Sequence, residues 1–267
     1  LRRQRQMCIR DRLPMSQRRS LMGNPDRRVR RAAFEGGNRA WAGVEATAAA
    51  ALNAISGTRL TLNRHRDIGD FLDVALFQAA ISRDSLEAMF AAIFGSAELP
   101  KRILTVKARA LNQDGISWYD LEAPLPLPEE APVNWDGAKQ MVCDGFGQAY
   151  PKLAEFTQSV FERQWVDWEP RPSKQSGGFC TGSLLSNESR IFMTYNETVG
   201  DVRTLAHEAG HAFHSFVLKE TRPYARHYPM TLAESASTFG EMILTDGLLG
   251  DDSTLSTVDK LRLLDME

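Results

Sequence analysis

The stretch "TLAHEAGHAFHSF" (residues 204–216) says more about the fold than any other part of this sequence. Residues four apart on an α-helix lie about 40° apart around its axis, so His207 and His211 would share one face. Glu208 follows the first histidine and could reach a water held at the metal without binding the metal itself. The His-Glu-x-x-His pattern therefore indicates two zinc ligands and a general base on one helix.

A catalytic zinc site needs a third protein ligand. Zinc proteases with an extended motif place glycine and histidine where this sequence has His214 and Val217, so that class is excluded. The stretch "LAESASTFGEMIL" (residues 232–244) offers the alternative, a glutamate on the next predicted helix. Glu234 is the expected third ligand. Glu241 lies about two turns further along the same face, where it would hydrogen-bond a ligating histidine from the second shell.

Apolar spacing predicts a mostly helical chain with a small β element beside the motif. Four prolines between residues 121 and 132 indicate an extended connector. Strands are expected at about residues 178–182 and 190–195. Helices are expected over one or two segments of residues 25–65, and at about residues 82–95, 101–111, 135–143, 147–164, 201–219 and 229–247.

The composition limits the functional classes. Hydrophobic residues make up 43% of the 267 residues and no apolar run is long enough to cross a bilayer, so no membrane segment is expected. Eleven arginines lie in the first 31 residues, which leaves the rest of the chain acidic and poorly suited to nucleic acid. The three cysteines are scattered, which favours a reducing compartment, and we expect a cytoplasmic protein.

Residues 1–19 are basic and show no periodicity. An organelle transit peptide and a nucleic-acid arm are two interpretations of such a segment. The stretch "MCIRDR" looks like translated sequencing-adapter DNA, and we therefore expect residues 1–19 to be a non-native or disordered segment without functional meaning.

The two quoted stretches together resemble the oligoendopeptidase F branch of the thimet oligopeptidase family of zinc endopeptidases. "WVDWEPRPSKQSGGFCTG" and "KARALNQDGISWYDLEAPLP" are similar to that branch as well, so the resemblance runs from about residue 25 to the end. It implies a helical zincin-type metallopeptidase domain with a small β-sheet beside the zinc helix. It also implies one Zn²⁺ per chain, held by His207, His211 and Glu234, with Glu208 as the base.

Members of this branch are typically about twice as long, so the resemblance implies an internal fragment, incomplete at both ends. Residues 20–75 would be the end of an N-terminal helical domain, and residues 76–267 the first part of the catalytic domain. The histidine and tyrosine residues that hold the substrate in the family lie further downstream, and the sequence does not identify their equivalents.

Two further groups of residues are candidates at the site. His214 shares the face of His207 and is expected in the second shell or packed rather than as a ligand. Gly177, Gly178 and Phe179 lie at the start of the predicted strand, whose edge could pair with a peptide main chain. An ordinary hairpin packed on the helices is the alternative interpretation of that strand.

The predicted function is a zinc endopeptidase that hydrolyses short peptides. A zinc carboxypeptidase of related fold and a catalytically inactive metal-binding fragment are the alternatives. Membrane proteases of the AAA type share His-Glu-Ala-Gly-His but need a Gly-x-x-x-x-Gly-Lys-Ser/Thr loop, which this sequence lacks. The sequence does not predict the oligomeric state.

Overall fold

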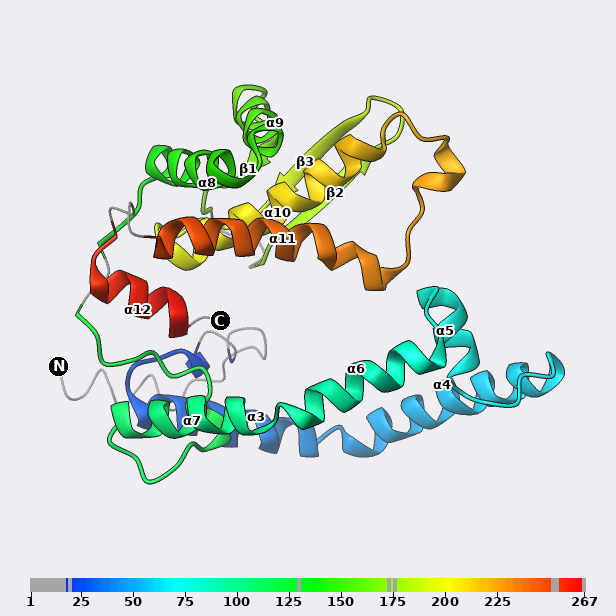
Figure 1. Cartoon of the computed structure of the whole chain (residues 1–267). Coiled ribbons are helices and arrows are strands. Elements are labelled where there is room, and N and C mark those ends of the chain that lie inside the picture. The colour runs from blue at the N-terminus through cyan, green and yellow to red at the C-terminus, as the bar shows by residue number, and fades with distance from the viewer. Residues whose placement is uncertain are drawn as a thin grey trace. The chain divides into compact units, whose positions relative to one another are not determined.

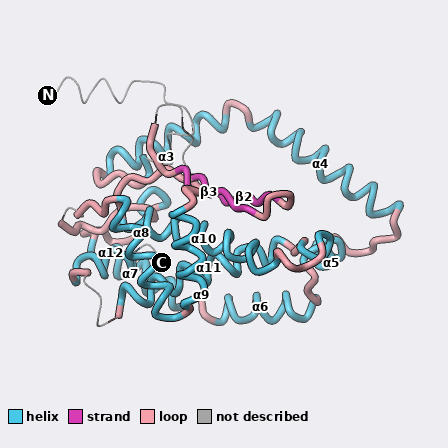
Figure 2. The backbone as a smooth tube through the Cα atoms, turned by 90° about the horizontal axis from the view of Figure 1, so that it is seen from above, coloured by secondary structure: helices cyan, strands magenta, loops and turns pink. Residues whose placement is uncertain are grey.

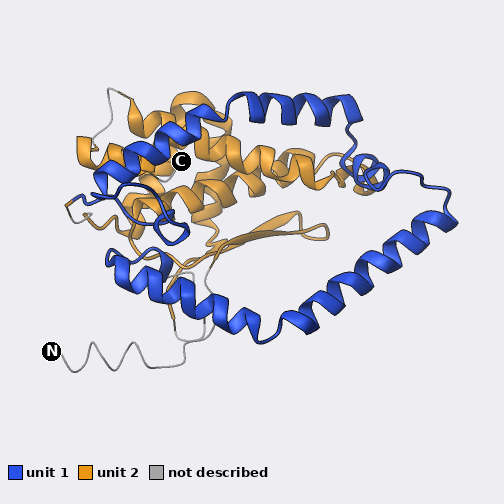
Figure 3. Ribbon diagram, turned by 90° about the horizontal axis from the view of Figure 1, so that it is seen from below, with its two compact units in different colours: residues 1–127 blue, residues 128–267 orange. Residues whose placement is uncertain are grey.

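The computed structural model describes residues 18, 21–128, 131–171, 174, 177–250 and 255–265. It consists of two compact units, residues 1–127 and residues 128–267 (Figure 3). The segment expected to be non-native, residues 1–19, lies outside the described residues except for Arg18. The domain division near residue 75 refers to a longer protein and stays a prediction.

The first unit is helical. One or two helices were expected in residues 25–65, and the structure has two, which are separated at Gly43. Gly36 and Gly37 lie inside the first of them without interrupting it. Its elements are α3 (Arg27–Ala42), α4 (Glu45–His65), α5 (Asp73–Ala79), α6 (Arg83–Gly95), α7 (Glu98–Ala110) and η1 (Trp118–Asp120).

A buried carboxylate ties α3 to η1. Asp120 is fully buried and accepts hydrogen bonds from Arg27 at 2.9 Å and from Arg30 at 2.9 Å. Burial opposes the charge on Asp120, but the hydrogen bonds from the two guanidinium groups outweigh it and lower the pKa of the carboxyl below its usual value. One acidic residue thus fixes two segments that are far apart in the sequence.

The second unit contains the hydrophobic core. It also contains the two motif stretches quoted above, on the helices drawn in yellow and orange in Figure 1. The core includes Phe146, Val160, Ile191, Leu205 and Leu244, each almost fully buried. The elements are α8 (Trp135–Ala149), α9 (Pro151–Glu162), β1 (Val166–Asp167), β2 (Phe179–Ser183), β3 (Glu188–Phe192), α10 (Val199–Leu218), η2 (Pro223–Arg226), α11 (Met230–Leu249) and α12 (Thr257–Asp265).

The three strands form a sheet in the order β1-β3-β2. β2 and β3 are antiparallel, with Phe179 opposite Phe192, and appear side by side in Figure 2. β1 pairs with β3 in parallel, with Val166 opposite Ile191, and was not predicted because two residues are too short to show a periodic pattern. Both β2 and β3 contact α10, so the sheet lies beside the motif helix. The predicted fold class is therefore confirmed.

Two glycines let α10 and α11 touch along their backbones. A Cβ atom at Gly210 of α10 would collide with the carbonyl oxygen of Ala236 and lie 2.8 Å from Cα of Ser237 in α11. A Cβ atom at Gly240 of α11 would lie 2.8 Å from the carbonyl oxygen of Ala206 in α10. Only glycine fits at either position, and this close crossing brings residues of both helices to one point.

None of the helices in the described part of the chain is long and apolar enough to span a membrane.

Candidate metal centre

The motif helix α10 begins with a capping box. The Thr198 hydroxyl accepts a hydrogen bond from the backbone N–H of Asp201 at 3.1 Å, and the Asp201 carboxylate accepts one in return from the N–H of Thr198. The helix was expected to begin at about residue 201, but it begins at Val199, and Asp201 occupies the third helical position. The helix then runs without a break through His207 and His211.

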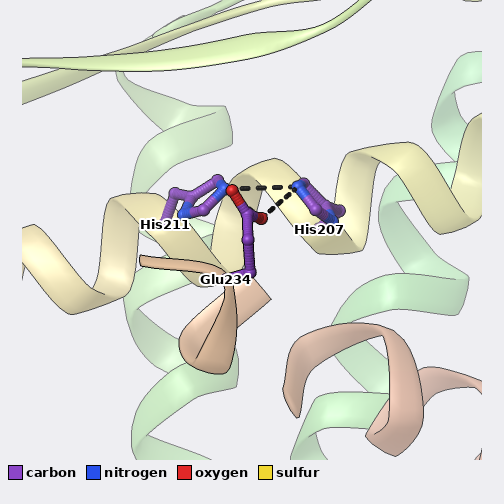
Figure 4. A group of neighbouring side chains, drawn as sticks. All are labelled: His207, His211 and Glu234. Atoms are coloured by element: carbon purple, nitrogen blue, oxygen red, sulfur yellow. Dashed lines mark hydrogen bonds and ion pairs between the residues drawn. The ribbon is translucent and has the colours of Figure 1, made fainter. Parts of the chain in front are cut away.

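The two histidines and Glu234 point toward one another from two helices (Figure 4). Nε2 of His207 lies 3.2 Å from Nε2 of His211. Oε2 of Glu234 lies 3.4 Å from the first of these nitrogens and 3.3 Å from the second. The three potential ligand atoms therefore form a nearly equilateral triangle.

The size of this triangle fits zinc. Zinc binds imidazole nitrogen and carboxylate oxygen at about 2.0–2.2 Å in tetrahedral geometry, which places neighbouring ligand atoms about 3.3–3.5 Å apart. The distances of 3.2, 3.3 and 3.4 Å agree with three corners of such a tetrahedron. Two imidazoles and one carboxylate are also a donor set typical of catalytic zinc sites, which keep the fourth corner open.

A carboxylate behind the first histidine orients its ring. Glu241 accepts a hydrogen bond from Nδ1 of His207 at 2.5 Å, and a second one from Nε of Arg203 at 2.6 Å. Glu241 thus contacts the ring nitrogen of His207 that does not face His211 and Glu234. Arg203 was missed by the sequence analysis, although it lies one turn before His207 on the same face of the helix.

Glu208 is buried, with 4% of its surface exposed, and Oε2 has no hydrogen-bond partner in the part of the chain that the structure describes. Burial raises the pKa of Glu208 to about 7; His207 opposes this rise and the Glu234 carboxylate adds to it. Glu208 lines a cavity of about 360 Å³ together with His207, Gly200, Arg203, Thr204 and Glu241. A carboxylate with such a pKa can both accept and return a proton near neutral pH.

Gly178 lies directly against this carboxylate. A Cβ atom at Gly178 would be 2.8 Å from Oε1 of Glu208 and 3.3 Å from Cγ2 of Thr204. Gly177 has a φ of 109°, a backbone conformation that favours glycine. The two glycines therefore bring the start of β2 to the side of Glu208. Phe179 opens β2 and stacks on Phe192 at 5.0 Å.

His214 does not join the metal group. Its ring stacks on Tyr228 with centroids 4.3 Å apart, and burial lowers the pKa of the imidazole. Cys180 of β2 is partly buried, and burial together with the nearby Glu208 raises the pKa of its thiol to about 12. A thiol that stays protonated at neutral pH is a poor nucleophile, which favours a packing role for Cys180.

A sequence model described as "Peptidase family M3" matches residues 146–263, a segment that contains α10, α11 and all three atoms of the triangle. This segment of 118 residues, called the M3 segment below, is similar to peptidase family M3. The M3 segment thus begins within α8 and includes the whole sheet.

Two relatives are similar to this chain over most of its length, well beyond the M3 segment. An oligoendopeptidase F homolog of Lactococcus lactis subsp. lactis is 30% identical over 233 residues, which cover 86% of this chain and 38% of that relative. Oligopeptidase PepF of Bacillus subtilis is 25% identical over 87% of this chain and 35% of that relative. The resemblance to oligoendopeptidase F is confirmed, and the chain spans well under half the length of these relatives.

Solved structures share the fold. A crystal structure of a protein from Chlamydophila abortus superimposes with a TM-score of 0.78 at 24% identity, over 95% of this chain and 42% of that chain. Oligoendopeptidase-F from Enterococcus faecium superimposes with a TM-score of 0.60 at 21% identity, over 91% of this chain and 36% of that chain.

Proposed function

We propose that this chain carries the metal-binding part of a zinc-dependent endopeptidase that hydrolyses short peptides. The triangle formed by His207, His211 and Glu234 is the observation that carries this proposal, because its dimensions suit zinc and leave one coordination position open. The peptidase names of the relatives agree with it. A cytoplasmic location stays a prediction from the scattered cysteines.

His207, His211 and Glu234 would hold one Zn²⁺. When bound there, zinc supplies Lewis-acid polarisation of a carbonyl and lowers the pKa of water. The remaining steps belong to the side chains around it. Glu241 keeps the proton on Nδ1 of His207, so that Nε2 offers its lone pair to the metal.

Glu208 is the general base in this proposal. Its carboxylate takes a proton from the attacking water and then gives that proton to the leaving amine. Burial beside Gly178 supports the role because it excludes bulk water and raises the pKa of the carboxyl to about 7. No other described carboxylate lines the 360 Å³ cavity except Glu241, which is engaged with His207 and Arg203.

The substrate would lie along β2. This strand is at an edge of the sheet among the described strands, and four of its five residues are exposed. The start of the strand is formed by Phe179, preceded by Gly177 and Gly178. Gly178 lies against the Glu208 carboxylate. An extended peptide that pairs with this edge would use main-chain hydrogen bonds, which suits recognition of many sequences.

The test uses quenched-fluorescent peptides together with metal analysis by mass spectrometry. We would compare this 267-residue chain with a chain that has the full length of its relatives. Stoichiometric zinc in both, with cleavage of peptides blocked at both ends by the longer chain, is the expected result. Cleavage that needs a free carboxyl terminus would indicate a carboxypeptidase instead. Zinc binding without hydrolysis in either chain would leave a metal-binding protein that is not an enzyme.

A further inference from the structure

The contact between His214 and Tyr228 joins the end of the motif helix to the start of the helix that carries Glu234. The two rings are nearly parallel, at 23°, and 4.3 Å apart. His214 lies on α10, three residues after His211. Tyr228 lies in the connection between the helices, immediately before the N-cap residue Pro229 of α11.

Residues 230–232, at the start of α11, are exposed. Pro229 provides no side-chain hydrogen bond to the first turn, and Met230 and Leu232 are 79% and 52% exposed. The side chain of Glu234 is itself 56% exposed. The close backbone contact at Gly210 fixes the helix only from Ala236 onward. In the sequence, Glu234 therefore lies between Tyr228, which stacks on His214, and Ala236, whose backbone contacts Gly210.

The burial of His214 also points to a ring that packs rather than one that binds. Nδ1 is buried without a hydrogen-bond partner in the described part of the chain. A buried nitrogen without a hydrogen-bond partner costs free energy, and the stack of the ring on Tyr228 offsets part of that cost. The ring of Tyr228 covers one face of the imidazole.

We propose that His214 and Tyr228 are a pair of positioning residues that holds the first turns of α11 so that Glu234 completes the metal triangle. This inference rests on the proposed function, because it assumes that Glu234 binds the metal. It assigns the third histidine of "HEAGHAFH" (residues 207–214) to helix placement, in place of the second-shell role considered from the sequence.

The experiment measures zinc affinity by competition with a chromophoric chelator, on the whole chain. The variants are Tyr228→Ala, Tyr228→Phe, His214→Ala and the double alanine variant. Tyr224→Ala is the matched control, because Tyr224 lies in the same connection and is 85% exposed. Hydrogen exchange of residues 229–236 in the metal-free chain provides a readout that does not involve metal or activity.

We expect Tyr228→Ala and His214→Ala each to weaken zinc binding about tenfold, the scale typical of residues that support a ligand indirectly. The double variant should be no weaker than the single ones, since both changes remove one contact. Tyr228→Phe should retain the affinity because the ring is kept. Exchange in residues 229–236 should speed up in both alanine variants and stay unchanged in Tyr224→Ala.

Each contrary result is distinct. Unchanged zinc affinity and exchange in Tyr228→Ala would overturn the positioning role and leave the proposed function intact. An equal loss in Tyr224→Ala, or no rescue by phenylalanine, would overturn it too. If Tyr228→Ala does not fold, Tyr228→Phe and Tyr228→Leu still separate ring stacking from general packing, because only the former preserves a flat ring. A parent chain that binds no zinc would overturn both proposals.

Discussion

Nδ1 of His207 lies 2.5 Å from Oε1 of Glu241, whereas Nε2 of the same ring faces His211 and Glu234. A carboxylate can only accept a hydrogen bond, so the proton of the neutral ring is on Nδ1. The lone pair is then on Nε2, where the metal would be. Glu241 on α11 thus determines that Nε2 of His207 on α10, rather than Nδ1, has the lone pair that a metal can bind.

The first prediction follows from this hydrogen bond. Glu241→Gln should lower zinc affinity about 10- to 100-fold. An amide carries no negative charge to balance that of the metal, and it holds the proton on Nδ1 of His207 less firmly than a carboxylate does. Chelator competition measures the change. Glu220→Gln, an exposed glutamate after the end of α10, is the control and should bind zinc like the parent. Equal affinities for all three chains would show that Glu241 has no influence on the ligand.

The second prediction concerns Glu208. In a chain that hydrolyses peptides, Glu208→Gln should keep its zinc and lose at least about 100-fold in kcat, because the amide cannot accept a proton. Metal content and kcat are measured on the same preparation. A fully active glutamine variant would rule out Glu208 as the base.

The third prediction tests the contact between the helices. Gly210→Ala should destabilise the second unit by about 1–3 kcal/mol, because the new Cβ would collide with the carbonyl oxygen of Ala236. Gly147→Ala is the matched control: it lies in α8, its nearest contact is 3.9 Å away, and it should stabilise the helix by up to about 1 kcal/mol. Urea unfolding followed by tryptophan fluorescence compares them. Similar shifts for both variants would contradict the close crossing.

The fourth prediction concerns Asp120 in the first unit. Asp120→Asn should destabilise this unit by about 3 kcal/mol, because two arginines lose a buried charged partner. Glu35→Gln, which affects an exposed pair with Arg31 in the same helix, should change little. Hydrogen exchange in α3 reports on both variants. Equal protection in the two variants would show that burial of Asp120 adds nothing.

The same carboxylate predicts a pH dependence. Its pKa is lower in the folded chain, so its contribution to stability is complete above the unfolded value of about 4 and is lost as the pH falls through the folded value. Protection of α3 in the parent should therefore decline below about pH 4 relative to Asp120→Asn. A constant difference between the two chains down to pH 2 would contradict this assignment.

The fifth prediction concerns the edge of β2. Peptides with a single N-methylated amide near the scissile bond should show a raised KM, because each methyl group removes one main-chain donor. The protein is unchanged in this test, so folding does not complicate it. Unchanged KM for every methylated position would indicate that the strand does not pair with substrate.

Local spacing predicted that His207, His211 and Glu234 would come together, as they do in the structure, whereas their binding of a metal stays a prediction. The positions of His207 and His211 on one turn, and of Glu234 on the next helix, are properties of helical periodicity. The helices over residues 82–95 and 229–247 were predicted for the same reason and were found with shifts of a few residues.

Relationships between elements were not predictable in this way. Arg203 contacts Glu241 only because α10 and α11 cross, and Tyr228 meets His214 only because the connection folds back. Threonine and aspartate are both residue types that favour the N-cap, and in α10 the cap is Thr198, with Asp201 forming the other half of the capping box. Residue preferences at helix starts could not predict which of the two is the N-cap. The reciprocal hydrogen bonds in the structure identify Thr198.

Because backbone atoms at Gly210 and Gly240 set the crossing of α10 and α11, the separation of the two helices does not depend on which side chains stand at positions 207, 211 and 234. Donor atoms at these positions can therefore be exchanged without repacking the helices. Substituting a softer or a harder donor for Glu234 would alter the preference among transition metals while the frame stays in place. The helix pair is in this respect a template for redesigning metal selectivity.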